Sequence, residues 1–390
     1  MSLVEKTKKL FFKKYKREAQ KKDRCDPSLL ILILVLSAFG SLMVFSASYA
    51  YAERRYGDSF YFVKRQILWL FVGLVAMFLT SRLSIAALRK AAPFAYLFTV
   101  ISLILVPIIG TTAGGAKRWI SIGGLSFQPS EFAKMTLILM LAYYFERKRE
   151  KILAYDKPRE SITYGALIPF AMIGAVCGLV MLQKHLSGLI ILGAIGILVM
   201  FLAGTNPKIL GSLALMGVAA VSALALFTDY TKRRILIWLN PELYPLDGGW
   251  QTLQGMMAIG SGGFFGLGFG NSRLKFSYVS EPQNDFIFTI TCEELGFLGA
   301  LSVILLFTLF VARACKLALN VNDPFAKIVG LGLGSKVALQ VLLNIAVVTN
   351  TIPNTGISLP FFSYGGSSLV MLFTEMGILL AISKISNTGR

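Results

Sequence analysis

Asp285 is a carboxylate at the point where a polar segment of the chain meets a long apolar one. The stretch 281–296 is predicted to begin a helix. At about 100° per residue, one stripe of that helix holds small and polar residues, namely Asp285, Thr289, Cys292 and Gly296. Such a stripe is typical of a cleft wall rather than of a lipid-facing surface. A carboxylate at the mouth of a cleft can take a proton from a hydroxyl group or coordinate a divalent cation. We therefore predict Asp285 as the catalytic residue.

Two further acids, Glu293 and Glu294, lie on the same predicted helix, roughly 12–14 Å deeper at 1.5 Å per residue. Carboxylates inside a membrane helix are costly and usually functional. A structural ion pair or an interhelical hydrogen bond is an equally open interpretation.

The composition predicts a membrane protein. The 390 residues are 55% hydrophobic and have a mean hydropathy of +0.67. Only 15% are charged, against about 25% in soluble proteins. Much of the net charge of +19 is concentrated in two runs, 6–24 and 147–159, which flank apolar stretches. These runs indicate orientation and contact with anionic lipid, so we expect no nucleic-acid partner. The four cysteines and the single histidine, His185, have no metal-site or disulfide spacing.

We expect an all-α polytopic fold with about ten transmembrane helices. The predicted spans are 28–49, 61–80, 92–109, 129–145, 162–182, 186–203, 207–227, 285–313, 325–348 and 369–385. They form one membrane domain, 28–385, between a basic tail, 1–27, and a short tail, 386–390. The basic clusters place both termini in the cytoplasm.

With that orientation, three loops share the outer face with Asp285: a Gly-rich loop at 110–128, a large loop at 229–284 between helices 7 and 8, and 349–367. Their cations and glycine N–H groups suit a phosphate or pyrophosphate. The tryptophans and Tyr364 offer surfaces for stacking on sugars, although interfacial anchoring explains most membrane tryptophans.

Several charged residues have two interpretations each. Lys117 and Arg118 contact substrate or lie at the interface as snorkelling charges. Glu131 and Lys134, spaced i,i+3, form a structural pair or shape the cleft. Arg273 and Lys275 hold an anionic leaving group or belong to a solvated loop.

Lys336 lies deep in a span and needs a partner; Glu131, Glu293 and Glu375 are the candidates.

Taken together, the motifs resemble those of the SEDS membrane proteins of bacterial wall synthesis (FtsW, RodA and SpoVE). The resemblance covers nearly the whole chain after the basic tail. The motifs that carry it are Lys117-Arg-Trp-Ile, Phe127-Gln-Pro-Ser-Glu131 with Lys134, Arg233-Arg-Ile, Leu239-Asn-Pro, Gly249-Trp-Gln, Gly260-Ser-Gly-Gly, Glu281-Pro-Gln-Asn-Asp285-Phe-Ile-Phe, Glu293-Glu-Leu-Gly, Pro353-Asn-Thr-Gly, Leu359-Pro and Ser363-Tyr-Gly-Gly-Ser-Ser.

The resemblance implies an inverting glycosyltransferase that polymerises lipid II on the outer face of the bacterial cytoplasmic membrane and releases undecaprenyl pyrophosphate. It implies Asp285 as the general base or as part of a metal-assisted activator, with Mg or Mn as the possible cation and no organic cofactor. It places Arg118, Glu131 and Lys134 where they position substrate, and the matched motifs add Gln283, Ser363 and Tyr364 to the expected substrate-binding residues. The expected partners are a class B penicillin-binding transpeptidase and other division proteins.

Within that family, the segments 270–276 and 281–285 look more like the division and sporulation branch than the elongation branch. Lys184, where proline is expected, and Asn271, where glutamine is expected, depart from the pattern and affect fine substrate contacts. The alternatives are a flippase or other transporter of the lipid-linked precursor, and a non-catalytic scaffold of the division machinery.

Overall fold

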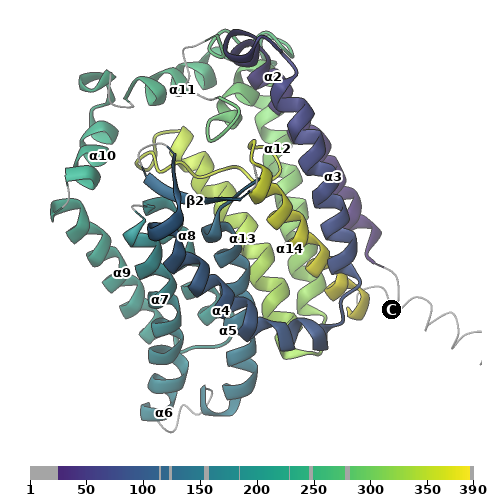
Figure 1. The fold of residues 1–390 in the computed structure, drawn as a ribbon, viewed down its shortest axis with the longest axis vertical. Helices are drawn as coiled ribbons and strands as arrows, with labels where there is room; N and C mark the ends of the chain where they lie inside the picture. The colour runs from purple at the N-terminus through teal and green to yellow at the C-terminus, as the bar shows by residue number, and fades with distance from the viewer. Residues whose placement is uncertain are drawn as a thin grey trace, which may run out of the picture.

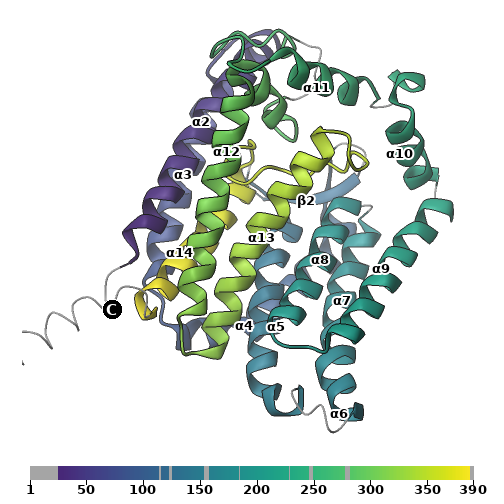
Figure 2. The same cartoon turned by 180° about the vertical axis from the view of Figure 1, so that it is seen from behind.

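The chain forms a bundle of long helices, seen from two sides in Figures 1 and 2. The computed structural model describes residues 25–386, except 114–115, 123–124, 153–157, 184, 228, 246–248 and 277–281. The expectations for Lys184, for nearly all of the basic tail 1–27 and for all but residue 386 of the tail 386–390 lie outside the described residues.

The first half of the chain contributes helices and one small sheet. Its elements are α2 (Pro27–Tyr56), α3 (Tyr61–Ser81), α4 (Ile85–Ile109), β1 (Thr111–Ala113), β2 (Ala116–Ile122), β3 (Leu125–Phe127), α5 (Pro129–Ile152), α6 (Pro158–Ile162), the π-helix η1 (Thr163–Leu167), α7 (Ile168–Leu182) and α8 (Leu186–Leu202).

The second half is helical wherever it has regular structure. Its elements are α9 (Pro207–Phe227), α10 (Asp229–Leu239), the 3-10 turn η2 (Pro241–Leu243), α11 (Gly249–Ser261), α12 (Ile287–Leu319), α13 (Pro324–Val348) and α14 (Gly366–Ile385).

Helices α13 and α14 form the centre of the bundle. Their apolar windows are 61% and 67% buried, whereas those of the other long apolar helices are between 22% and 39% buried. The outer helices expose leucine, isoleucine and phenylalanine side chains, as a lipid-facing surface requires. The central position of α13 explains how it holds polar residues within an apolar helix.

Small residues let α3 and α14 approach closely, as is usual between membrane helices. A Cβ atom at Gly377 would lie 1.9 Å from the Thr80 hydroxyl, and one at Gly73 would lie 2.8 Å from the Phe373 ring. The Thr80 hydroxyl also donates to the carbonyl of Thr374, at 3.1 Å. These contacts hold α14 against α3.

Seven helices of the described residues are long and apolar enough to cross a membrane: α2, α3, α4, the helix Arg159–Leu182, α12, α13 and α14. The other three predicted spans correspond to α5, α8 and α9. Helix α5 carries Glu131 and Lys134 near its start and a basic run at its end, and α8 has only 17 residues. The chain is a multi-pass membrane protein, and the count of ten spans stays a prediction.

The expectation of a purely helical fold is wrong at residues 110–128. This stretch forms a three-stranded antiparallel sheet in the order β1-β2-β3, with Lys117 opposite Thr112 and Ile120 opposite Phe127. Threonine, tryptophan and isoleucine favour strands.

The interpretation of 229–284 as one long loop also needs correction, because α10 and α11 occupy much of it. Both helices lie at the upper end of the bundle in Figure 1, whereas α6 lies at the lower end.

Candidate functional site

Asp285 precedes its helix instead of lying on it. Helix α12 begins at Ile287, and its backbone breaks at Gly296, with φ 66° and ψ −164°, a region that only glycine adopts readily. The predicted polar stripe is therefore wrong at both ends, although Thr289 and Cys292 are buried along the helix as a cleft wall would be.

The glycines of residues 260–270 serve the break in α12. A Cβ atom at Gly262 would lie 2.0 Å from the carbonyl oxygen of Cys292. The N–H groups of Leu267 and Gly268 donate to the carbonyls of Glu293 and Glu294 at 3.0 and 2.9 Å. These N–H groups, which we expected to bind phosphate, are used within the protein.

The side chains of Glu293 and Glu294 hold the chain that leads to Asp285. Glu293 accepts from the main-chain N–H of Arg273 at 2.9 Å and from the Ser272 hydroxyl at 2.5 Å. Glu294 pairs with Lys275 at 2.7 Å, and both side chains are fully buried. Of the two open interpretations, the structural one is confirmed for Glu294.

A side-chain amide on α13 holds the main chain at Asp285. The Nδ2 atom of Asn344 donates to the main-chain carbonyls of Asp285, at 2.9 Å, and of Ile357, at 2.6 Å. Gly356 lies against the acid: a Cβ atom there would be 3.0 Å from Asp285 Oδ2, and the φ of Gly356 is +67°. The segment before α14 thus passes so close to the carboxylate that a side chain at position 356 would crowd it.

Two adjoining pockets lie beside this contact. One, a small cavity of about 30 Å³, is lined by Ser130, Lys134, His185 and Gly356 among others. The other, of about 20 Å³, is lined by Lys336, Ser363 and Ser368 among others. Glu131, Gln340 and Ser358 line both, so the pockets form one polar path.

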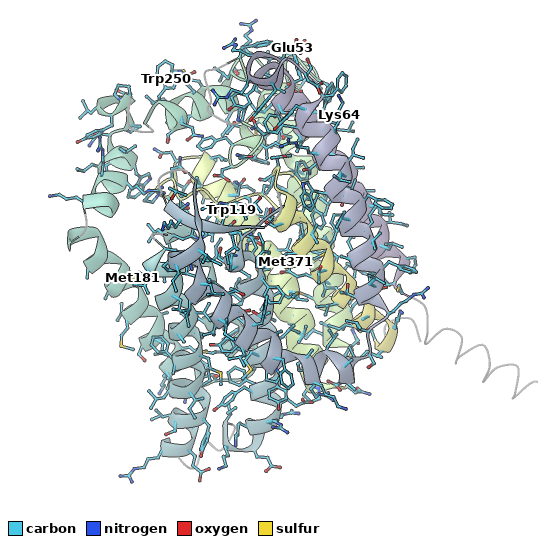
Figure 3. The ribbon with its side chains drawn as sticks, viewed as in Figure 1. Glu53, Lys64, Trp119, Met181, Trp250 and Met371 are labelled. Carbon is cyan, nitrogen blue, oxygen red and sulfur yellow. The ribbon has the colours of Figure 1, made fainter. Side chains whose placement is uncertain are left out.

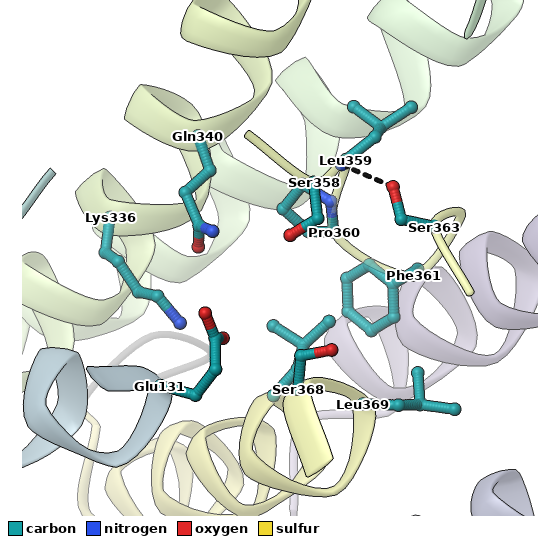
Figure 4. A pocket seen from close by; sticks show the side chains of 11 residues that line it. Glu131, Lys336, Gln340, Ser358, Leu359, Pro360, Phe361, Ser363, Ser368 and Leu369 are labelled. Carbon is teal, nitrogen blue, oxygen red and sulfur yellow. Dashed lines mark hydrogen bonds between the residues drawn. The ribbon is translucent and has the colours of Figure 1, made fainter. Parts of the chain in front are cut away.

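Figure 4 shows the second pocket, with the side chains of Glu131 and Lys336 pointing toward one another. Glu131 also accepts from Lys134 at 2.7 Å, which confirms the predicted i,i+3 pair. The partner of Lys336, left open among three acids, is Glu375 at 2.5 Å. Three charged side chains, Glu131, Lys134 and Lys336, therefore line the polar path, and Glu375 on α14 pairs with Lys336 behind them.

The pocket that contains His185 has a positive electrostatic field. Burial lowers the pKa of His185 to about 4; the charges of Arg118, Lys134 and Arg234 act in the same direction, against that of Glu131. His185 lies in the link between α7 and α8, and its Nδ1 is 3.4 Å from the Ser130 hydroxyl. The imidazole is thus neutral at pH 7 among cations contributed by β2, α5 and α10.

The strand β2 explains why Arg118, rather than Lys117, contributes to this field. Successive side chains of a strand point to opposite faces. Lys117 is exposed and donates to the carbonyl of Pro107 at 3.5 Å, whereas Arg118 is partly buried and acts on His185. Lys117 is therefore placed at the surface and not in the pocket.

Other predicted substrate-binding residues have structural contacts. Lys275 is buried against Glu294, and the side chain of Arg273 is exposed, so neither lines the polar path. The main-chain carbonyl of Gln283 accepts from the N–H of Tyr364 at 2.9 Å, and the Tyr364 ring packs edge-on against Phe62 at 5.0 Å. Of this group only Ser363 lines a pocket, and its hydroxyl accepts from the N–H of Leu359 at 2.7 Å.

Figure 3 separates the tryptophans that we considered for sugar stacking. Trp250 lies at the upper end of the molecule and Trp119 lies lower, on the small sheet. Trp238 on α10 donates its indole N–H to the carbonyl of Asn350 at 2.9 Å. That bond, with the one from Arg234 to the carbonyl of Asn354 at 2.6 Å, fixes α10 against the segment 350–356.

The described residues do not fit a tightly held divalent cation. No three histidine, cysteine, aspartate or glutamate side chains come together among them. The nearby charges that act on His185 are mostly positive. A hard cation needs several oxygen ligands, so we derive no step through a metal.

Two polar residues of the site escaped the sequence-based predictions. Gln340 and Asn344 follow Lys336 at intervals of four residues, which places all three on one face of α13. This spacing was a usable signal within an otherwise apolar run. His185 was considered only as a metal ligand, and its packing beside Ser130 has no local sequence signature.

The fold and the site define a class: a polytopic helical membrane protein with a charged polar pocket at one end of its bundle. The chain belongs to the FtsW, RodA and SpoVE family, because the family model described as "Cell cycle protein" matches residues 27–388. The resemblance inferred from the motifs is thereby confirmed.

Relatives and solved structures agree with this assignment. The chain is 38% identical over 372 residues to stage V sporulation protein E of Bacillus subtilis, covering 94% of this chain and 99% of that protein. It is 35% identical to a probable peptidoglycan glycosyltransferase FtsW of Geobacter sulfurreducens, covering 93% and 95% of the two chains.

Among solved structures, a chain from the structure described as "Structural coordination of polymerization and crosslinking by a peptidoglycan synthase complex" superposes with a TM-score of 0.76 at 28% identity, covering 92% of this chain and 97% of that chain. The rod shape determining protein RodA of Thermus thermophilus superposes with a TM-score of 0.69 at 27% identity, covering 93% and 98%.

Proposed function

We propose that this protein is a peptidoglycan glycosyltransferase that polymerises lipid II into glycan strands, with Asp285 as the general base. The observation that carries the proposal is the contact between the Asp285 carboxylate and Gly356, at the edge of a polar pocket with a positive field. The relatives named as FtsW supply the reaction class.

In the proposed reaction, an acceptor sugar hydroxyl transfers its proton to the Asp285 carboxylate. The hydroxyl oxygen forms a bond to the anomeric carbon of the donor chain. The bond from that carbon to the pyrophosphate oxygen breaks, and undecaprenyl pyrophosphate leaves with the electron pair. Attack opposite the leaving group inverts the anomeric configuration.

The cations around His185 suit the leaving group. Developing negative charge on pyrophosphate is stabilised by preorganised positive groups in a site with little water. Arg118, Lys134 and Arg234 come from three separate elements, and each acts on the same buried imidazole. A neutral His185 adds no charge of its own to this field.

The polar pocket would face the outside of the cytoplasmic membrane. The basic run at the end of α5 and the short helix α6 lie at the opposite end of the bundle, which the positive-inside rule assigns to the cytoplasm. A role in division or sporulation accords with the FtsW and SpoVE relatives. A class B penicillin-binding transpeptidase is the proposed partner, which accords with the coupling of polymerization to crosslinking in the similar synthase complex.

Polymerisation of labelled lipid II in liposomes tests the proposal. The purified protein with its cognate transpeptidase is expected to make long glycan that a muramidase digests. Labelled lipid II that crosses the bilayer without forming polymer would favour the flippase interpretation. An intact complex that neither polymerises nor moves lipid II would favour the scaffold.

A further inference from the structure

A third pocket lies at the other end of the bundle, away from Asp285. Its volume is about 480 Å³, and it is bounded by the ends of α5, α8 and α12 and the start of α13. Its lining includes apolar side chains, Phe145, Leu202, Val321 and Ile328, and two cations, Arg149 and Lys327. Phe145, Val321 and Ile328 are buried, so the apolar surface that a ligand can reach comes mainly from Leu202 and the exposed Leu319.

The acids near this pocket are already engaged. Arg89 binds Glu146, also in the lining, at 2.8 Å and Asp323 at 2.5 Å. The side chain of Asp323 also caps α13 by accepting from the N–H of Ala326 at 2.9 Å. This network joins α4, α5 and α13, and its one cation and two acids carry one net negative charge. Arg149 and Lys327 add two positive charges, so the region around the pocket has a net charge of +1.

The neighbours of Arg149 in the basic run of α5 have other contacts. Arg147 lies over the Tyr143 ring at 4.9 Å, and Lys148 and Lys151 lie over the Tyr164 ring at 5.6 and 4.5 Å. Within the described part of the chain, neither Arg149 nor Lys327 has an ion pair or a ring contact of this kind. In the sequence these basic residues look alike. In the structure, Arg147, Lys148 and Lys151 contact aromatic rings, whereas Arg149 lines the pocket.

We propose that this pocket binds a phosphate ester anion, and that the phosphate belongs to an anionic phospholipid. Two cations above an apolar wall match a phosphate joined to an acyl chain. At this pocket α5, α8 and α12 end and α13 begins. Membrane helices end at the level where lipid headgroups meet the acyl chains. This site is separate from the polar path beside Asp285, so it stands whether or not the proposed polymerisation is correct.

Thermal unfolding of the full chain in mixed micelles measures the binding. Phosphatidylglycerol, titrated into delipidated protein, is expected to raise the unfolding temperature, and phosphatidylcholine is not. The double variant Arg149→Gln/Lys327→Gln should need roughly thirtyfold more phosphatidylglycerol for half of the effect, at about fivefold per cation. The control Arg147→Gln/Lys148→Gln removes the same charge outside the pocket and should behave as the wild type.

The proposal would be overturned if both double variants needed the same increase in phosphatidylglycerol for half of the effect, or if neither needed more than the wild type. General surface charge would then explain any effect. If inorganic phosphate raises the unfolding temperature of the wild type as much as phosphatidylglycerol does, the bound phosphate need not belong to a lipid, and that part of the proposal would be overturned. If the double variant does not fold, Asn322→Trp places a large ring at the pocket lining and keeps both cations. It should abolish the phosphatidylglycerol effect, and an unchanged effect would contradict the site.

Discussion

The side-chain amide of Asn344 donates hydrogen bonds to the main-chain carbonyls of Asp285 and Ile357, which belong to segments about seventy residues apart in the chain. Asn344 is fully buried on α13, one of the two central helices. One side chain therefore fixes the proposed base relative to the loop that forms the other wall of its pocket.

Replacing Asn344 with leucine should impair catalysis more than stability. The two carbonyls would lose their donor, at a cost of about 1–3 kcal/mol of unfolding free energy, and Asp285 would lose its anchor. We expect the rate of lipid II polymerisation to fall at least tenfold in a protein that still folds. Asn320→Leu is the control, because it removes an exposed bond to the Lys316 carbonyl at the other end of the bundle. Equal activity in the two variants would exclude a positioning role.

Gly356→Ala tests the close approach to Asp285. The added methyl group would be 3.0 Å from the carboxylate oxygen, and the backbone at Gly356 has φ +67°. The positive φ alone costs alanine about 1 kcal/mol, so a control with the same strain is needed. Gly57→Ala provides it: its φ is +66°, and nothing lies within 4 Å of the new Cβ. We expect both to lose similar stability and only Gly356→Ala to lose polymerisation, by tenfold or more.

Lys275 was predicted to hold the leaving group, and its burial against Glu294 points to a structural role instead. Lys275→Met should destabilise the fold by about 3–5 kcal/mol, because it leaves a carboxylate buried without its partner. Adding Glu294→Gln removes that charge and should restore most of the stability. Polymerisation should return with the fold. A stable double variant that makes no glycan would instead show that Lys275 acts on the substrate.

The buried His185 makes stability depend on pH. Its pKa in the folded protein is about 4, whereas in the unfolded chain it is about 6.5. As pH falls through 6.5, the unfolded chain binds the proton first, so stability is full above about 6.5 and is lost progressively down to about 4. The unfolding temperature of wild type in detergent should fall across that window. His185→Gln should flatten this part of the profile, and an unchanged slope would contradict the assignment.

Much of the bundle was predictable because its signals are local. Apolar runs mark the long helices, and Asp26, Ser84 and Asp323 cap three of them through side-chain bonds to N–H groups two or three residues into the helix. The Glu131–Lys134 pair follows from i,i+3 spacing alone. Asp285 was singled out because a carboxylate at a polar–apolar boundary is a local anomaly, and its role stays a prediction.

The remaining features depend on contacts that spacing does not encode. Lys336 had three possible acids, and only the packing of α13 against α14 selects Glu375. The Gly-rich run 260–270 was expected to offer free N–H donors. Instead it packs against the break in α12 at Gly296, and the sequence gives no signal for that break. Lys117 and Arg118 are neighbours in sequence, and only the strand geometry of β2 places them on opposite faces.

The central claim is that the Asp285 carboxylate takes the proton of the attacking hydroxyl, and Asp285→Asn tests it most directly. The measurement is glycan formation from labelled lipid II by the purified complex, with Asp58→Asn as the matched control, since Asp58 is a solvent-facing carboxylate paired with Lys64 at 2.8 Å. We predict normal assembly for both variants, wild-type polymer from Asp58→Asn and a loss of at least about a thousandfold from Asp285→Asn. Polymer from Asp285→Asn at the wild-type rate would contradict the account.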